Sequence, residues 1–196
     1  MRFEALKSYV LKLLEDGLPS NLHYHGLHHT LYVYDAADRI ADHENIFGND
    51  RELLMTGVLL HDIGFLETYH QHEEKGVELA AKILPGFRYS ASEIELIQSL
   101  IMRTKIPQVA FNKLEEIICD ADLDYLGTEH FLPIGNQLFR EFLEYGIIAD
   151  EKAWNILQVN FLSSHTYFTS YARNYRAEKK SQNLDLVKKI VETYTD

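Results

Sequence analysis

Apolar residues recur along most of the chain at the three- and four-residue spacing of amphipathic helices. The first such segment covers residues 3–14 and stops at a Gly-Leu-Pro sequence that is typical of a helix end. In a second segment, over about 27–42, one face carries His29, Val33 and Ile40. Because the other residues on that face are apolar, we expect His29 to point into the interior.

The same periodicity predicts helices along the rest of the chain. Helices are expected at about 50–62 and 73–84, and after the caps Ser90 and Asn112. Two or three more are expected beyond residue 130. The longest of these begins at Asp150 and runs through Phe168, and the last covers 184–194. We find no alternation of useful length that would indicate strands, and no internal repeat or linker. The sequence therefore predicts an all-α fold, a single-domain helical bundle over residues 1–196.

Composition narrows the class of protein. The 196 residues are 46% hydrophobic and 25% charged, which describes a globular domain and excludes a disordered chain. Cys119 is the only cysteine, so we expect no internal disulfide and a reducing, cytoplasmic location. We expect neither an export signal nor a membrane span, because no apolar run has the necessary length. The formal net charge of −11 disfavours binding to nucleic-acid polymers.

Histidines are concentrated in one part of the chain: of ten in total, eight lie within residues 23–72. Histidine is the commonest metal ligand. His61 and Asp62 stand together at the end of one predicted helix, and Asp122 stands among apolar residues near the end of another. An imidazole or carboxylate on an apolar helix face is costly to bury unless it is paired or ligated. We therefore expect these side chains to meet His29 in the interior.

Two imidazoles and two carboxylates would favour a divalent cation. A mixed set of nitrogen and oxygen ligands suits Mn, Fe, Ni or Zn, or Mg where carboxylates and water dominate. On an octahedral ion, four protein ligands leave about two positions for water or substrate. Such open positions indicate a reactive site.

Three segments carry a resemblance to a known family. They read YHGLHHT at 24–30, LLHDIG at 59–64 and CDADL at 119–123. Their order and spacing resemble the H…HD…D pattern of the HD-domain superfamily of metal-dependent phosphohydrolases. The resemblance covers about residues 20–130 and implies an all-helical bundle, with helices of 131–196 expected to complete the pocket. The ligands that it implies for one or two divalent metal ions are His29, His61, Asp62 and Asp122.

The choice of ligands within these motifs leaves alternatives open. His28 adjoins His29, and both Asp120 and Asp124 flank Asp122. A shift of one residue turns a helical side chain by about 100°, so a neighbour in place of the chosen residue would point elsewhere. His29 is preferred because it shares its face with apolar residues, and Asp122 because its Ala-Asp-Leu context best matches the family.

The chain departs from the family's pattern beside the HD pair. Some branches have a lysine just after the HD-x-G turn, whereas this chain has Phe65. Several two-metal branches add two histidines on later helices, and His70 and His72, only two residues apart, match them in part. Whether the site holds one metal ion or two therefore stays open.

Groups that act on the substrate are expected around the metal. As a ligand and nearby base, Asp62 would orient or deprotonate water, and His72 would bind the phosphoryl group or protonate the leaving oxygen. His25 would reach the substrate from a loop, and Lys75, three residues after His72, would hold an anionic phosphate. The alternative for Lys75 is a solvated charge at a helix start.

A basic and aromatic stretch from His165 to Lys180 departs from the acidic balance of the chain. This composition is typical of a pocket wall for a nucleotide or aryl phosphate, so we assign His165 and Lys180 to substrate binding. The alternative is a helix that packs its aromatic face on the core while its Arg and Lys are solvated.

The sequence thus predicts a metal-dependent phosphohydrolase that cleaves a phosphomonoester or phosphodiester with a metal-activated water, with a nucleotide as the favoured substrate. Two alternatives stay open. One is a non-catalytic sensor that binds a nucleotide, and the other is a di-iron oxygenase, to which some members of the superfamily have diverged. These residues do not fix the identity of the metal or the oligomeric state.

Overall fold

The structure, a computed structural model that describes residues 2–194, consists of α-helices joined by 3-10 turns and loops, without strands in that range. The all-α fold predicted from the sequence is confirmed; residues 1 and 195–196 of the predicted single domain lie outside the described part. The 3-10 turns are η1 (Ile63–Leu66), η2 (Leu84–Phe87) and η3 (Asp124–Gly127). The helices are α1 (Arg2–Gly17), α2 (Leu27–His43), α3 (Gly48–Leu60), α4 (His72–Ile83), α5 (Ala91–Arg103), α6 (Lys113–Asp122), α7 (Phe131–Glu144), α8 (Glu151–Ser164), α9 (Ser170–Tyr175) and α10 (Ala177–Glu192).

Side-chain caps begin three helices where the sequence predicts them. Ser90 and Glu93 form a capping box, in which the Ser90 hydroxyl accepts from the Glu93 amide at 3.4 Å and the Glu93 carboxylate accepts from the Ser90 amide at 2.8 Å. Asn112 accepts from two amides at the start of α6, and Asp150 accepts from the Ala153 amide at the start of α8. Because these caps satisfy N–H groups that have no partner within the helix, local sequence fixes where α5, α6 and α8 begin.

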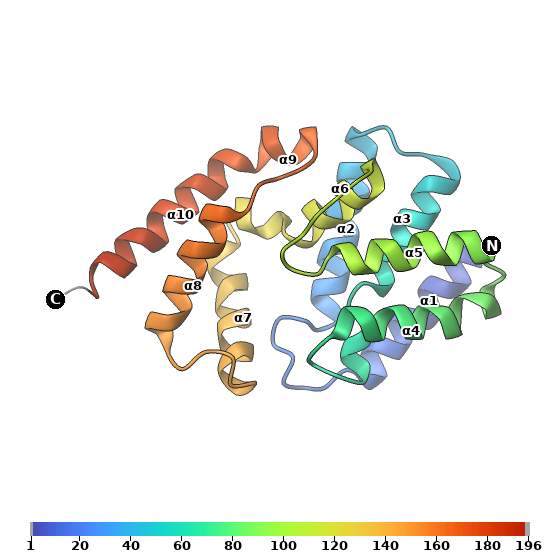
Figure 1. Ribbon diagram of the computed structural model, residues 1–196, viewed down its shortest axis with the longest axis horizontal. Coiled ribbons are helices and arrows are strands. Elements are labelled where there is room, and N and C mark those ends of the chain that lie inside the picture. The colour runs from blue at the N-terminus through green and yellow to red at the C-terminus, as the bar shows by residue number, and fades with distance from the viewer. Residues whose placement is uncertain (1, 195–196) are drawn as a thin grey trace.

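The helices form two groups along the longest axis of the molecule (Figure 1). α1, α3, α4 and α5 lie toward the end that carries the N-terminus, and α7, α8 and α10 lie toward the end that carries the C-terminus. α2 and α6 lie between them, with α2 packed against both α3 and α6. The three helices that carry the sequence motifs, α2, α3 and α6, therefore pack against one another where the N-terminal group meets the middle of the molecule.

Three clusters of buried apolar side chains hold these helices together. The first joins α2, α3 and α6 through residues such as Val33, Val58 and Ile118. The second lies between α1, α3 and α5, and the third combines Tyr24 with apolar residues of η3, α7, α8 and α10. Burial of apolar surface contributes about 25 cal/mol per Å² and is the dominant favourable term in folding. The segment just after α6 thus belongs to the same cluster as the C-terminal helices.

The helix predicted to begin at Asp150 ends earlier than expected. α8 stops at Ser164, His165 is extended with φ of −69° and ψ of 135°, and the helix has 14 residues against 17 in α2. The prediction that it runs through Phe168 as the longest helix is therefore wrong. The reason is tertiary, because the buried Asp120 carboxylate accepts a hydrogen bond from the Phe168 amide at 2.9 Å. In a continued helix that amide would bond to its own helix instead.

The last helix begins earlier than predicted, at Ala177 rather than at residue 184. Its first turns are polar, so they show no apolar periodicity, but Asn183 is buried there and its amide donates to the Leu126 carbonyl at 2.8 Å. None of the helices in the described part of the chain has the length and apolar character that a bilayer crossing requires.

Candidate metal centre and cavity

Two consecutive side chains face the same point where α3 ends. His61 is the C-terminal cap of α3, and Asp62 has non-helical φ and ψ of −105° and 9° before η1 begins. In an unbroken helix successive side chains point about 100° apart. The change from α-helix to 3-10 turn instead brings His61 Nε2 and Asp62 Oδ2 to 3.1 Å from each other.

His29 and Asp122 complete a cluster with this pair. His29 lies on the first turn of α2 and Asp122 is the last residue of α6. His29 Nε2 is 3.2 Å from Asp122 Oδ1 and 3.4 Å from His61 Nε2. One ligand atom from each of His29, His61 and Asp122 lies within 4.8 Å of the other two, a grouping that could hold a metal ion. Asp62 Oδ2 lies beside them, 3.5 Å from His29 Nε2.

The neighbouring residues in the motifs point elsewhere. His28 is exposed. Asp120 accepts hydrogen bonds from the Thr169 amide and hydroxyl, both at 2.7 Å, and Asp124 pairs with Arg176 at 2.7 Å. These two carboxylates connect the end of α6 to the C-terminal segments and do not enter the cluster.

The donor set of the cluster fits a cation. His61 Nδ1 lies 2.8 Å from the Val58 carbonyl oxygen, an acceptor for its proton, which leaves Nε2 to bind a metal. Asp62 Oδ2 is buried and accepts no hydrogen bond from the described residues. Burial lowers the pKa of His61, but the Asp62 and Asp122 carboxylates outweigh it and raise that pKa to about 9. The cluster therefore strongly favours positive charge.

A buried carboxylate from α7 fixes the loop before α2. Glu141 accepts hydrogen bonds from the backbone amides of Tyr24 at 2.8 Å and His25 at 3.1 Å, and its other oxygen contacts His25 Nδ1 and the Tyr69 hydroxyl. Burial would raise the pKa of Glu141, but its contact with His25 lowers it, and the same contact raises the pKa of His25 against the effect of burial. With Nδ1 engaged, the other ring nitrogen of His25 is left for a ligand.

Phe65, the departure from the family's pattern, orients two imidazoles. The ring centroids of His25 and His72 stack at 4.5 Å and 4.0 Å from that of Phe65. His72 Nε2 in turn lies 3.5 Å from Asp62 Oδ1. The close approach of η1 to α4 depends on Gly64, where a Cβ atom would overlap the His72 carbonyl oxygen. His72 is thereby held at the edge of the cluster.

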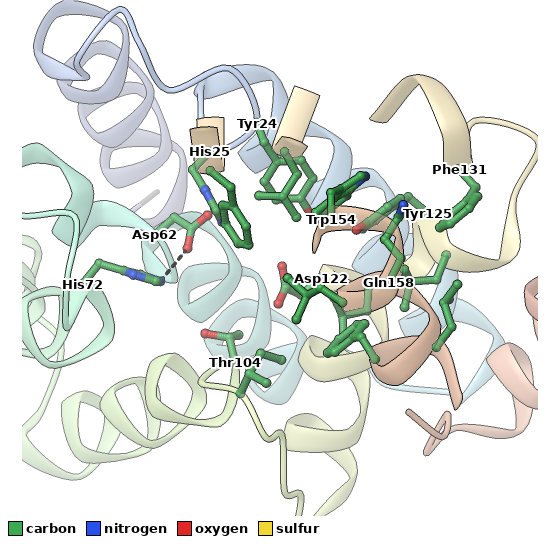
Figure 2. Close-up of a pocket in the computed structure, with 18 of the residues that line it drawn as sticks. Tyr24, His25, Asp62, His72, Thr104, Asp122, Tyr125, Phe131, Trp154 and Gln158 are labelled. Atoms are coloured by element: carbon green, nitrogen blue, oxygen red, sulfur yellow. Dashed lines mark ion pairs between the residues drawn. The ribbon is translucent and has the colours of Figure 1, made fainter. Parts of the chain in front are cut away.

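Asp62 and Asp122 of the cluster line one end of a cavity of about 300 Å³, next to the buried His29 and His61. Figure 2 shows Asp62 and His72 at one side of this cavity, Trp154 and Phe131 at the other, and Asp122 between them. Side chains of α7 and α8 supply most of the far side. The cavity therefore has a polar end, which holds the candidate ligands, and an apolar end.

The structure separates the predicted substrate-binding residues. His25 and His72 line the cavity with Asp62. Lys75 lies outside the lining, where its ammonium group pairs with Glu78 at 2.6 Å. The geometry thus places the two imidazoles, but not the lysine, where a ligand of the cluster would be.

His165 and Lys180 do not line the main cavity. His165 lines a second cavity of about 180 Å³ together with Gln108. Lys180 Nζ lies 3.2 Å from His165 Nδ1 and donates to the His165 carbonyl oxygen. Burial and the nearby Lys180 charge lower the pKa of His165 to about 4, so its imidazole is neutral at pH 7. Substrate binding by these two residues stays a prediction.

Glu141 and Gln108 are among the polar residues of the site that the sequence predictions miss. Glu141 has a recognisable signal, because it falls on the apolar face of α7 that carries Ile134 and Leu138, where a carboxylate needs a partner. Gln108 donates to Asp122 Oδ2 at 3.1 Å. It lies between α5 and α6, in a loop whose path depends on tertiary packing, so the sequence offers no comparable signal.

Comparisons with known proteins place these motifs in a family. The family described as HD domain matches residues 26–124, just over half of the chain and the span that holds all four clustered residues. An uncharacterized protein of Clostridium beijerinckii (strain ATCC 51743 / NCIMB 8052) is 36% identical over 81 residues, which are 40% of this chain and 51% of that protein. The chain therefore spans about half the length of this relative.

A solved structure extends the likeness to the fold of nearly the whole chain. It is the crystal structure of a predicted HD superfamily hydrolase from an uncultured Thermotogales bacterium, with a TM-score of 0.63 and 20% sequence identity. The match covers 95% of this chain and 92% of that one. At this identity the likeness shows that the two share a fold, including the helices beyond residue 124.

Proposed function

Because the chain belongs to the HD domain family, we propose that it is a metal-dependent hydrolase of small phosphate esters, either monoesters or diesters. The observation that carries the proposal is the cluster of His29, His61, Asp62 and Asp122 at the polar end of the cavity. Two imidazoles and two carboxylates that converge beside an open space suit a catalytic cation better than a closed structural site.

His29, His61 and Asp122 would hold the divalent cation, with Asp62 beside them. When bound, the cation supplies the positive charge and Lewis acidity that hydrolysis of a phosphate ester requires. We assign Asp62 to orienting the attacking water and accepting its proton, and His72 to protonating the leaving oxygen. Both side chains line the cavity, and their facing atoms are 3.5 Å apart.

The single cysteine and the net charge support two further parts of the proposal, the location of the protein and the size of its substrate. The buried free thiol of Cys119 is consistent with a reducing, cytoplasmic location. A net charge of −11 favours a small substrate over a nucleic-acid polymer. The nucleotide substrate expected from the sequence stays a prediction.

Metal content and phosphate release test the proposed function. We expect the purified protein to bind a divalent metal and to hydrolyse p-nitrophenyl phosphate, bis(p-nitrophenyl) phosphate or a nucleotide. Asp122→Asn keeps the shape of the side chain but removes its charge, and should lower metal content and reduce activity by at least about 100-fold. Asp185→Asn, at an exposed position of α10, is the matched control.

Three results would contradict the proposal. Full metal content and activity in Asp122→Asn would show that the cluster is not the site. Tight nucleotide binding without turnover under any divalent metal would indicate the sensor. Bound iron with oxygen consumption would indicate the oxygenase.

A further inference from the structure

The apolar end of the cavity lies across from the metal cluster, where the body of a substrate bound at the cluster would extend (Figure 2). Resting on the proposed function, we infer that the substrate is a small phosphate ester whose alcohol part is an apolar alkyl or aryl group, and not a nucleoside. Four features of the cavity carry this inference: its wall, the charge of its lining, its size and its single amide.

Rings and branched aliphatic groups make up the wall. From α7 and α8 it takes Phe131, Leu138, Phe142, Trp154, Phe161 and Leu162. The ring centroids of Phe142 and Trp154 are 5.8 Å apart and nearly perpendicular, at 85°, a favourable edge-to-face arrangement. A ligand that extends along this wall exchanges water for hydrocarbon contact, which increases affinity about fourfold for each buried methylene group.

The described residues that line the cavity include neither Lys nor Arg. Lysines close to the polar end are engaged outside it, Lys75 with Glu78 and Lys105 with Glu74. A nucleoside diphosphate or triphosphate carries several negative charges, which proteins usually hold with Arg or Lys. The lining therefore fits a ligand with a single phosphate group, bound at the cluster of candidate metal ligands, rather than a polyphosphate.

The size of the cavity suits a small ligand. At about 300 Å³ it lies at the lower end of the range usual for ligand-binding cavities, so it can cover a phosphate group together with a short apolar group. A longer alkyl chain would extend past the wall to the surface, where Leu157 is exposed.

One amide side chain, Gln158, stands among the described lining residues, and it is already engaged in the wall. Its Nε2 donates to Asn155 Oδ1 at 3.1 Å, and Asn155 Nδ2 donates to the Tyr194 hydroxyl at 2.8 Å. A nucleobase has several donors and acceptors on its edges, and each is costly to bury without a partner. An alkyl or aryl group brings no such requirement.

Binding of unreactive phosphonates tests the inference without turnover. With the Mn²⁺-loaded protein, calorimetry would compare methyl-, butyl-, hexyl- and octylphosphonate with adenosine and uridine monophosphates. We expect affinity to rise about fourfold per methylene up to about six carbons and then level off. Affinity that does not depend on chain length, or nucleoside monophosphates that bind more tightly than hexylphosphonate, would overturn the inference.

A matched pair of variants on α7 locates the effect in the wall. Leu138→Asn places an amide in the lining, and Leu143→Asn makes the same change at an exposed position outside it, so both carry the same change in helix propensity. We expect Leu138→Asn to weaken hexylphosphonate about tenfold and methylphosphonate little, and Leu143→Asn to weaken neither. Equal weakening by both variants would contradict the assignment of this wall.

A second variant separates a base-reading amide from an apolar wall. If Gln158 recognised a nucleobase, Gln158→Leu would weaken nucleoside monophosphates and leave alkylphosphonates unchanged. We expect instead that hexylphosphonate binds the variant at least as tightly as the wild type. Thermal unfolding shows whether each variant is folded. If a variant does not fold, the chain-length series on the wild type still tests the inference.

Turnover distinguishes failure of this inference from failure of the proposed function. Chain-length-dependent phosphonate binding without hydrolysis of any phosphate ester would support the apolar class of ligand and overturn the phosphohydrolase. Hydrolysis with a preference for nucleotides over hexyl or phenyl phosphate would keep the phosphohydrolase and overturn the inference.

Discussion

The two ends of the cavity are held together by different kinds of interaction. At the polar end the contacts are directional, as between His61 Nδ1 and the Val58 carbonyl oxygen at 2.8 Å. At the apolar end the contacts are those of packed rings and aliphatic groups, such as Phe142 against Trp154. Directional contacts weaken steeply when geometry changes, whereas apolar burial changes in proportion to area. We therefore expect sharp losses from substitutions at the polar end and graded losses at the apolar end.

The largest effect is expected from Gly64→Ala. The new Cβ atom would overlap the backbone of α4 at His72, so η1 or α4 must move and Asp62 with it. We expect a loss of about 3 kcal/mol or more in the free energy of unfolding, together with loss of activity. Urea unfolding and metal content check this. Gly86→Ala is the control, because a Cβ atom there meets nothing within 4 Å, and equal stability of the two variants would contradict the prediction.

Glu141→Gln tests the hydrogen bonds by which α7 holds the polar end. The amide cannot accept from all of its partners, so groups of Tyr24, His25 or Tyr69 lose a buried acceptor. We expect about 2 kcal/mol less stability and a decrease of about 10- to 100-fold in kcat, with metal content unchanged. Glu95→Gln, at an exposed position of α5, should change neither. A loss of metal in Glu141→Gln would show that α7 supports the ligands themselves.

Phe142→Leu probes the apolar end. It removes ring contact with Trp154 but keeps an apolar wall. We expect a cost of about 1 to 1.5 kcal/mol in stability and a KM for an apolar ester that rises severalfold while kcat is retained. Steady-state kinetics separate the two parameters. A fall in kcat with constant KM would mean that the wall is coupled to the chemistry, and would end the distinction between sharp and graded losses.

The smallest effect on stability is expected when the pH is lowered and Glu44 is protonated. This residue connects the end of α2 to α9. Burial acts to raise its pKa, but hydrogen bonds from the Ser170 hydroxyl and the Tyr171 amide, with the nearby Lys113 charge, lower the pKa to about 2. Because the folded pKa lies below the ordinary value of 4.5, the stabilisation is present above about pH 4.5 and is lost as the pH falls toward 2.

Glu44→Gln removes this titration, so stability should fall by about 1 kcal/mol less in the variant than in the wild type between about pH 6 and about pH 4. Chemical denaturation at the two pH values measures the difference. Parallel losses in both proteins would show that this contact does not contribute.

The polar end was largely predictable because its signals are local. The inward direction of His29 follows from the apolar residues four and eleven positions later on the same helix face, and a charged Asp122 among apolar neighbours needs a partner. Order and spacing of the motifs then matched a family. The choice between His28 and His29, and between Asp120 and Asp122, remained open. It depends on the rotation of each helix about its axis, which the packed structure defines.

The apolar end was not predictable to the same degree. Its wall depends on which faces of α7 and α8 meet, and these helices lack a motif. The end of α8 at Ser164 depends on Asp120, a residue more than forty positions earlier, because that carboxylate takes the amide of Phe168. The basic residue Lys180 is likewise drawn to the carbonyl of His165, a contact that composition alone does not reveal.

The contacts of Glu141 affect which chimeras of this protein and its relatives would keep an intact site. The match to the family ends at residue 124, while this carboxylate lies beyond it and holds the backbone of Tyr24 and His25. A chimera that joins residues 2–124 to the C-terminal helices of a relative would inherit every clustered ligand. It would hold the His25 backbone and engage His25 Nδ1 only if the incoming helix brought a carboxylate to the same place, so this position is the one to match when the partner of a gene fusion is chosen.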